Sequence, residues 1–351
     1  YFFKMSNYQD ALINHIKQNP EFIKPETRKN EILGFLRKPL NDLCISRPKS
    51  RLSWGIEIPF DDNYVTYVWF DALMNYITAI GWGSDNNNFN FWWPANYHLI
   101  GKDILTTHAV YWSTMLLAAK LPLPKSILAH GWWLSDENKI SKSLGNSIKP
   151  LDLIDHYGVD SLRYFLMRDM VLGNDANFSL NSFVKRYNAD LANDYGNLVN
   201  RVTMLVHKNF NSLIPESGDF DDLDLELISV TKNTVKTVKE NFNYLKIHDA
   251  LENIFFVIRE INKYLEKRAP WKLVKIDNSQ GSIAATTLAV AADILRIITQ
   301  ILYPFMPEKT SIILEILGSK DIPLKNLQFG ELKPGTYLGE GKSPFPRIEN
   351  R

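Results

Sequence analysis

The sequence predicts a parallel α/β sheet followed by an antiparallel bundle of α-helices. Between residues 63 and 130, segments with strand character alternate with segments of helical periodicity, which is typical of a parallel sheet with crossover helices. From about residue 153 onward the apolar residues recur at helical spacing only, as they do in a helix bundle. A chain of 351 residues is long enough for two or three domains, each with its own core.

Composition and charge exclude several classes of protein. Hydrophobic residues make up 45% of the chain and charged residues 23%, which is ordinary for a globular protein, and no apolar run reaches the roughly 18 residues that cross a bilayer. Cys44 is the single cysteine, so this chain holds no intrachain disulfide and no multi-cysteine zinc site, and a reducing compartment is expected. With a formal net charge of +1, a site for a polyanion has to be a local patch.

Residues 1–62 are predicted to be a connecting region that returns to a larger fold. Their short helical patterns are broken by Asn-Pro and Lys-Pro pairs, and the alternation around Trp54 and Ile56 predicts a strand. The sequence starts without methionine and in mid-element, so we expect the natural protein to begin upstream of Tyr1.

The alternating region is predicted element by element. The predicted elements are a strand at 63–70 (NYVTYVWF), a helix at 71–82, a strand and turn at 97–103 (YHLIGKD), a helix at 108–120 and a strand at 126–134 (SILAHGWWL). Sheets of this kind bind their ligands at the carboxyl ends of the strands.

Two apolar stripes define the predicted bundle. They are Leu191, Tyr195, Leu198, Val202 and Leu205, and Leu251, Ile254, Ile258, Ile261 and Leu265. A further long apolar helix is predicted at 283–306, where prolines stop it. The last twenty residues are rich in glycine and proline and are predicted to be an irregular tail.

A polar loop at 136–146 follows the strand that ends near residue 134. It carries Lys139 and Lys142 three residues apart, with Ser141 and Ser143 beside them. Ammonium groups and hydroxyl groups can donate to phosphate oxygens. A short motif of this kind is also compatible with a solvated surface turn.

The Gly-Lys-Asp turn at the end of an earlier strand favours the phosphate interpretation. Gly101 allows a ligand to approach the backbone, and Asp103 can accept hydrogen bonds from the hydroxyl groups of a ribose. Together with the polycationic loop, this turn outlines a nucleotide site.

The motif KISKS at 139–143 resembles the KMSKS signature of class I aminoacyl-tRNA synthetases, with Ile140 in place of methionine. The segments YVWFDALMNY, HLIGKDILTTHAVYW, ILAHGWWL, NLVNRV, EKRAPW and FPRIE resemble the methionyl-tRNA synthetases in the same order and across nearly the whole chain. The resemblance implies the carboxyl-terminal two thirds of such an enzyme, which activates methionine with ATP to methionyl-adenylate and transfers it to tRNA(Met).

The resemblance also implies the fold and the division of the chain. The fold is α/β plus all-α: the second half of a Rossmann-like catalytic domain, followed by an anticodon-binding helix bundle. The implied parts are the end of a connective peptide and the return to the catalytic fold at 1–62, the Rossmann-like half at 63–130, the signature loop and stem-contact region at 131–177, and the anticodon-binding domain with its irregular tail at 178–351.

For the chemistry, the resemblance implies Lys142 as the principal catalytic residue, holding the β and γ phosphates, with Lys139 assisting. Positioned cations suit the attack of a carboxylate on the α phosphorus, where charge develops on the transferring oxygens. The implied ATP-binding residues are Gly101, Asp103, His130, Gly131, Trp133, Ser141 and Ser143. An alternative for Trp132 and Trp133 is that one lies in the core and the other covers a strand edge.

The implied methionine-binding residues are Trp69, Ala72, Tyr76 and His108. A pocket for methionine has to be apolar, because the thioether offers area and sulfur-aromatic contact but little else. The first three fall on one helical face, which is equally compatible with ordinary packing of a helix on a sheet.

The implied anticodon-binding residues are Asn197, Arg201 and Trp271. The first two lie one helical turn apart and beside the apolar stripe, where an amide and a guanidinium can contact base edges, and a tryptophan can stack on an unpaired base. The alternative is a solvated helix face with a buried tryptophan.

The second signature of class I synthetases, His-x-Gly-His, is absent from this sequence and is expected upstream, together with any zinc knuckle. Two alternatives therefore stay open: a non-catalytic tRNA-binding fragment or paralogue, and a class I ligase for isoleucine, valine, leucine or cysteine. We expect Mg²⁺ with the ATP, no metal site in this chain, no membrane partner and a monomer. The expected location is the bacterial cytoplasm or, as an alternative, an organellar matrix.

Overall fold

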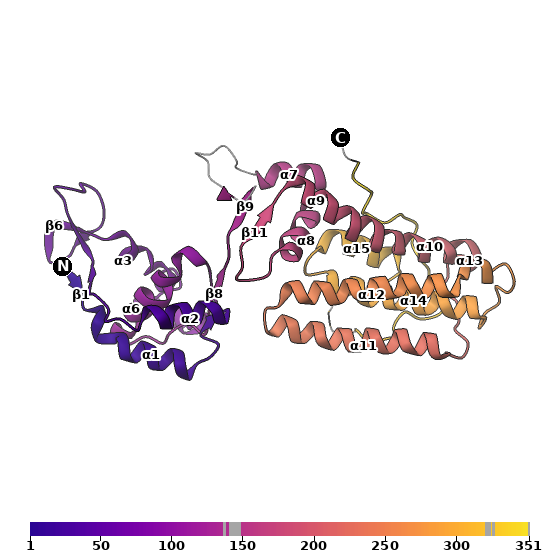
Figure 1. Cartoon of the computed structure of the whole chain (residues 1–351), viewed down its shortest axis with the longest axis horizontal. Helices are drawn as coiled ribbons and strands as arrows, with labels where there is room; N and C mark the ends of the chain where they lie inside the picture. The colour runs from indigo at the N-terminus through magenta and orange to yellow at the C-terminus, as the bar shows by residue number, and fades with distance from the viewer. Residues whose placement is uncertain (136–137, 140–148, 320–323, 325–326, 350–351) are drawn as a thin grey trace. The chain divides into compact units, whose positions relative to one another are not determined.

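The computed structural model describes residues 1–135, 138–139, 149–319, 324 and 327–349 (Figure 1). The chain forms two compact units. Unit 1 comprises residues 1–132 and 173–175, and unit 2 comprises residues 133–172 and 176–351. The four-part division of the chain given above stays a prediction.

The centre of unit 1 is a parallel sheet, as predicted, and it consists of three strands. Its order is β2 (Ile23–Lys24), β8 (Ile127–His130) and β7 (His98–Gly101), and both pairings are parallel. The helices of unit 1 are α1 (Gln9–Gln18), α2 (Glu26–Phe35), α3 (Val68–Ala72), α4 (Asn75–Thr78), α5 (Asn86–Trp92), a π-helix (Thr107–Trp112) and α6 (Ser113–Ala118), with short 3-10 turns at Met5–Tyr8 and Lys102–Ile104.

The strand predicted at 63–70 differs from the structure in position and in sheet. It is β6 (Asp61–Thr66), which pairs antiparallel with β4 (Ser46–Pro48) and β5 (Glu57–Ile58) in a separate sheet. Only two residues separate β5 from β6, and so short a connection can form a hairpin but not a parallel crossover. A further antiparallel pair joins β1 (Phe2–Phe3) to β3 (Leu43–Cys44).

Two other predicted elements are divided in the structure. The helix predicted at 71–82 starts earlier and consists of α3 and α4. The strand predicted at 126–134 stops at His130 and resumes as β9 (Trp133–Ser135). The interruption falls at Gly131, where a Cβ atom would overlap the carbonyl oxygen of Asn174. The backbone of the segment 173–175 thus lies directly against this glycine.

Unit 2 is mainly helical, as predicted. Its helices are α7 (Pro150–Tyr157), α8 (Val159–Asp169), α9 (Leu180–Arg186), a π-helix (Tyr187–Gly196), α10 (Asn197–Asn209), α11 (Asp222–Asn243), α12 (Ile247–Arg268), α13 (Pro270–Leu273), α14 (Ile283–Leu302) and α15 (Pro307–Ile316). Figure 1 shows α11, α12 and α14 running alongside one another. A small sheet joins β9 to β10 (Asn138–Lys139) and β11 (Ala176–Phe178).

Both predicted apolar stripes face the core of unit 2. Every residue of the α12 stripe is buried, as are four of the five in the first stripe, and Leu205 packs against the same core from a half-buried position. α14 is buried on all sides, with Ala289 the exception in the stretch from Ala284 to Leu302. By length and composition α14 could cross a membrane, but burial of this kind also characterises the core helix of a globular protein.

Candidate functional site

Three of the four residues predicted to bind methionine meet around His108. Trp69 lies on α3 and Tyr76 on α4, and their rings contact the His108 ring with centroids 6.4 Å and 5.6 Å away. His108 is buried on the π-helix, whereas Trp69 is half-buried and Tyr76 is 37% exposed. Ala72, one turn after Trp69, is exposed. The cluster therefore has a buried base and an accessible aromatic face.

The hydrogen bonds of His108 define its tautomer. Its Nδ1 lies 2.9 Å from the carbonyl oxygen of Ile104, which can only accept, so Nδ1 carries the proton. Nε2 then accepts from the Tyr76 hydroxyl, also 2.9 Å away. Burial lowers the pKa of His108, and the hydrogen bond to Ile104 opposes this only in part. His108 is consequently neutral at neutral pH and fixes the direction of the Tyr76 hydroxyl.

His98 and Trp112 extend this cluster, and the sequence prediction did not include them. Trp112 donates from Nε1 to Nε2 of His98 over 3.2 Å, and the His98 ring lies 4.3 Å from the Tyr76 ring. Burial, and secondly the nearby His108, lower the pKa of His98 to about 4. The spacing of Trp112 four residues after His108 is a signal that could have identified it.

The predicted nucleotide residues gather at the carboxyl edge of the parallel sheet. Gly101 at the end of β7 is paired in register with His130 at the end of β8, so two loops leave the sheet side by side. A Cβ atom at position 101 would lie 2.6 Å from Oδ1 of Asp103, so a side chain at this position would displace the Asp103 carboxylate. His130 directs its Nδ1 to the carbonyl oxygen of Gly131 over 2.7 Å.

Next to this edge, four side chains form a closed contact set. Trp132 donates from its indole Nε1 to Oδ1 of Asp103 over 3.3 Å, and its backbone N–H donates to Oδ1 of Asp175 over 2.8 Å. Lys102 forms an ion pair with Oδ2 of Asp175 at 2.6 Å and lies 4.3 Å above the Trp132 ring. Neither Lys102 nor Asp175 was predicted, because the contact joins positions far apart in the chain.

The remaining predicted ATP residues behave differently. Trp133 packs its side chain on Phe165 in the core of unit 2, with centroids 5.9 Å apart, so a contact with ATP would have to come from its backbone. The backbone of Lys139 pairs with Leu134 in β10. Ser141, Lys142 and Ser143 lie outside the described residues.

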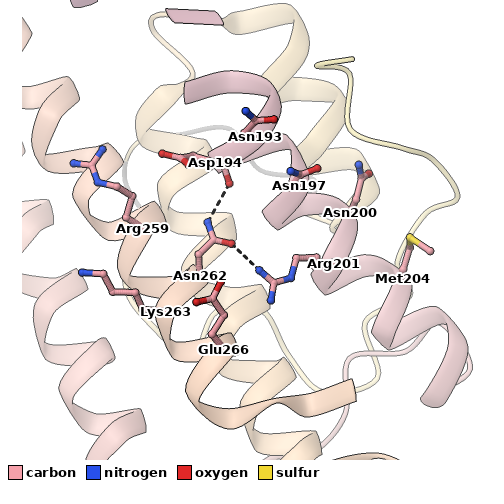
Figure 2. Close-up of a pocket in the computed structure, with 10 residues that line it drawn as sticks. All are labelled: Asn193, Asp194, Asn197, Asn200, Arg201, Met204, Arg259, Asn262, Lys263 and Glu266. Atoms are coloured by element: carbon pink, nitrogen blue, oxygen red, sulfur yellow. Dashed lines mark hydrogen bonds between the residues drawn. The ribbon is translucent and has the colours of Figure 1, made fainter. Parts of the chain in front are cut away.

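Two of the three predicted anticodon residues, Asn197 and Arg201, line a pocket of about 620 Å³ in unit 2. Its walls come from the π-helix, α10 and α12 (Figure 2). It is lined by Asn193, Asp194, Asn197, Asn200, Arg201, Met204, Arg259, Asn262, Lys263 and Glu266. Such a wall offers amides, cations and carboxylates within reach of one another.

Arg201 is held from two sides. Its guanidinium lies 5.2 Å from the Trp271 ring, which is 36% exposed, and donates to Oδ1 of Asn262 over 3.3 Å. Figure 2 shows Asn262 between Arg201 and Asp194, and its Nδ2 donates to the Asp194 carbonyl oxygen over 3.1 Å. Asn197 is exposed one turn before Arg201. Asn197 and Arg201 thus line one pocket, Trp271 contacts Arg201 from outside the lining, and Asn262 is a further lining residue that was not predicted.

No group of three or more His, Cys, Asp or Glu side chains that could hold a metal ion occurs among the described residues.

Comparison with known families divides the chain in two. Residues 1–203 match the family described as "tRNA synthetases class I (M)", and residues 214–350 match the "Anticodon binding domain of methionyl tRNA ligase".

Curated relatives match along almost the entire chain. A methionine--tRNA ligase of Clostridium acetobutylicum is 43% identical over 99% of this chain and 54% of its own length. One of Rickettsia conorii is 43% identical over 99% of this chain and 69% of its own length. The chain spans about half the length of most of the curated relatives it matches.

Among solved structures, the methionyl-tRNA synthetase of Mycobacterium tuberculosis in complex with methionyl-adenylate superposes with a TM-score of 0.92 at 39% identity. The match covers 99% of this chain and 68% of that one. A free-state structure of the same enzyme gives a TM-score of 0.90.

Proposed function

The chain belongs to the methionyl family of class I tRNA synthetases, and from this premise we propose that the full-length protein activates methionine with ATP and transfers it to tRNA(Met). The observation that carries the proposal is the arrangement in unit 1. An accessible aromatic cluster around His108 and a nucleotide-type turn at Gly101 are built on the same short sheet-and-helix unit.

In the first step, the methionine carboxylate attacks the α phosphorus of ATP, a methionyl-adenylate forms and pyrophosphate leaves. The step needs no general base, because the attacking carboxylate is already ionised at neutral pH. The main demand is the stabilisation of charge on phosphate oxygens, which we assign to Lys142 with Lys139 assisting. Ser141 and Ser143 would add hydroxyl donors to the same phosphates.

We assign the adenosine to the edge of the parallel sheet. Asp103 would accept from the ribose hydroxyl groups, Gly101 would let the ligand approach, and the backbone at Gly131–Trp133 would contact the adenine. The exposed position of Asp103 and the backbone turn at Gly131 support this assignment. His130, which caps the same turn, would hold its shape.

We assign the methionine side chain to Trp69, Ala72, Tyr76 and His108. Two aromatic rings and a methyl group provide apolar area for the thioether, with favourable sulfur-aromatic contact. The Tyr76 hydroxyl, fixed by neutral His108, adds one oriented polar group at the base of the pocket. This mixture of an apolar wall and few polar groups is typical of specific small-molecule sites.

In the second step, a hydroxyl group of the terminal adenosine of tRNA(Met) attacks the methionyl carbonyl, and AMP leaves. We assign recognition of the anticodon to Asn197, Arg201 and Trp271. The position of Asn197 and Arg201 at one pocket, with Trp271 against Arg201, supports this, since an amide and a guanidinium can read base edges and an exposed indole can stack on a base.

We propose that Mg²⁺ enters with ATP, bound mainly through the phosphates, as is usual for this ion. We further propose a monomer in the bacterial cytoplasm, with an organellar matrix as the alternative. Gel filtration and fractionation test these two points.

Methionine-dependent exchange of pyrophosphate into ATP by the full-length protein tests the activity. We expect exchange with methionine and none with isoleucine, valine, leucine or cysteine. Exchange with one of those amino acids instead would make the protein a ligase of another specificity. Binding of tRNA without any exchange would make it a non-catalytic tRNA-binding protein.

Lys142→Ala tests the assignment of the phosphate site. Loss of one charge-stabilising donor is expected to lower the rate of adenylate formation about 100-fold or more, with methionine affinity nearly unchanged. Single-turnover formation of methionyl-adenylate measures it, with Lys236→Ala on the exposed face of α11 as the matched control. An unchanged rate would remove Lys142 from the mechanism.

A further inference from the structure

We infer that Asp175 is a positioning residue of the nucleotide site, which holds Trp132 and Lys102 so that Asp103 and the Gly131 turn are ordered before ATP binds. The inference rests on the proposed function, since it deepens the role of the same site. It adds a carboxylate from a distant part of the chain to a turn otherwise built from β7 and β8.

The Asp175 carboxylate makes two bonds to neighbouring loops. One carboxylate oxygen, Oδ1, accepts the backbone N–H of Trp132 at 2.8 Å, and the other, Oδ2, receives the Lys102 ammonium at 2.6 Å. A carboxylate that holds a backbone amide and a side chain at once fixes both relative to itself. Asp175 therefore connects the loop after β8 to the loop after β7.

Trp132 and Lys102, the two residues that Asp175 holds, contact each other, and Trp132 also contacts Asp103. Lys102 lies 4.3 Å above the Trp132 ring, and the indole N–H reaches Oδ1 of Asp103 at 3.3 Å. Asp175 thus acts on Asp103 through Trp132. Since Asp103 is the carboxylate assigned to the ribose, its orientation is set in part by a residue that need not touch the nucleotide.

The backbone before Asp175 is itself anchored by two contacts. The carbonyl oxygen of the preceding Asn174 lies against the Cα atom of Gly131, in the space that a side chain would need. One residue earlier, the carbonyl oxygen of Gly173 accepts from Nη2 of Arg28 at 3.1 Å. The segment 173–175 is therefore fixed to unit 1 independently of the Asp175 carboxylate. The backbone that carries the Asp175 carboxylate is thus held by contacts of its own.

The competing interpretation is an ordinary ion pair at the surface. The side chains of Lys102 and Asp175 are 21% and 34% exposed, and exposed pairs contribute little to stability. A surface pair would leave the affinity for ATP unchanged when it is removed. A positioning residue would weaken binding of ATP selectively, so the two interpretations differ in a measurable quantity.

The experiment uses the full-length protein and the variants Asp175→Ala, Asp175→Asn and Lys102→Met. In methionine-dependent pyrophosphate exchange, Asp175→Ala is expected to raise the KM for ATP about fivefold to tenfold, with the KM for methionine within about twofold. Asp175→Asn keeps an oxygen for the Trp132 amide and should recover part of the loss. Asp62→Ala, an exposed aspartate of β6, is the matched control.

A double variant tests whether Asp175 and Lys102 act as one unit. If they do, Asp175→Ala combined with Lys102→Met raises the KM for ATP by less than the product of the two single effects. Unchanged ATP KM values in Asp175→Ala, or equal increases for ATP and methionine, would overturn the inference. If Asp175→Ala does not fold, Lys102→Met is the deciding variant. It should raise the KM for ATP without an equal rise in the KM for methionine.

Equilibrium dialysis of ATP separates this inference from the proposed function. If the wild-type protein exchanges with methionine, and Asp175→Ala leaves the affinity for ATP unchanged, the inference alone would be overturned. If the wild-type protein shows no exchange with methionine, but Asp175→Ala lowers the affinity for ATP about fivefold, the proposed function alone would be overturned.

Discussion

The two candidate recognition clusters of this chain are built from aromatic and polar side chains in opposite ways. In unit 1, His98, His108 and Trp112 are buried, and their hydrogen bonds join neutral groups. In unit 2, the Arg201 guanidinium lies on a partly exposed Trp271 at the wall of an open pocket.

This difference follows the chemistry of the two ligands that we propose. An uncharged thioether is bound by area, so the polar groups behind the aromatic wall must be satisfied by one another and kept neutral. A nucleic acid carries charge, so cations and amides must stay exposed to reach it. We therefore expect the cluster in unit 1 to be sensitive to acid, and the cluster in unit 2 to act on tRNA alone.

The largest expected effect is the response of unit 1 to acid. The folded pKa of His98 is about 4, below the ordinary value of about 6.5. Between these values the unfolded chain binds a proton that the folded chain excludes, so stability falls as the pH drops from 6.5 to 4. Above pH 6.5, this difference in pKa contributes about 3 kcal/mol to the free energy of unfolding.

Pulse proteolysis in urea at several pH values, with fragments assigned by mass spectrometry, measures this loss unit by unit. The control is His98→Gln, which keeps an acceptor for Trp112 but cannot titrate. Its free energy of unfolding should depend less on pH than that of the wild type. Identical pH slopes for the two proteins would contradict the neutral, buried state of His98.

The second effect concerns the cluster around His108, to which we assign the methionine side chain. His108→Leu leaves the Tyr76 hydroxyl without its acceptor and is expected to lower kcat/KM for methionine about 30-fold, without changing the KM for ATP or tRNA. Pyrophosphate exchange and aminoacylation measure these constants. His156→Leu, at an exposed position of unit 2, is the control. An equal loss for ATP would indicate a folding defect.

The third effect concerns the cluster of Arg201 and Trp271 in unit 2. Trp271→Ala removes the proposed stacking platform and the ring beneath Arg201, so the KM for tRNA should rise about tenfold. Pyrophosphate exchange should be unchanged, because it does not involve tRNA. Trp54→Ala, at a position that is 75% exposed in unit 1, is the matched control. Parallel loss of exchange and charging would argue against a role in tRNA binding.

The smallest effect concerns the support of Arg201. Asn262→Leu removes a single hydrogen bond to the guanidinium and should raise the KM for tRNA about threefold. Combined with Arg201→Leu it should add nothing, since the residue that it supports is gone. An additive double variant would show that Asn262 acts on tRNA directly.

The parts of the fold that depend on local pattern could be predicted from the sequence. The stripe that runs from the π-helix Tyr187–Gly196 into α10 and the stripe of α12 face the core as expected, and β7 and β8 are parallel neighbours. The two-residue strand β2 was not predicted, because so short a segment has no periodicity. The predicted pairing of β6 was wrong, because the local sequence of a strand does not determine its partners.

The candidate site was predictable to a similar extent. The resemblance supplied Tyr76, His108 and Arg201, which the structure brings into contact with one another or with further polar residues. It did not supply Asn262 or Asp175. Both act through side-chain contacts across a large sequence separation, 61 residues for Asn262 and Arg201 and 43 for Asp175 and Trp132, and no spacing rule reports such contacts.

The all-round burial of α14 has a consequence for the order of synthesis. α10 and α12, which share its core, precede it in the chain. These two helices have therefore left the ribosome by the time that α14 emerges, and a domain that folds during synthesis can cover part of its surface at once. Only α15, which shares the same core, is still to follow among the helices described. A circular permutant that begins at α14 would present the same apolar surface first, with nothing yet made to bury it.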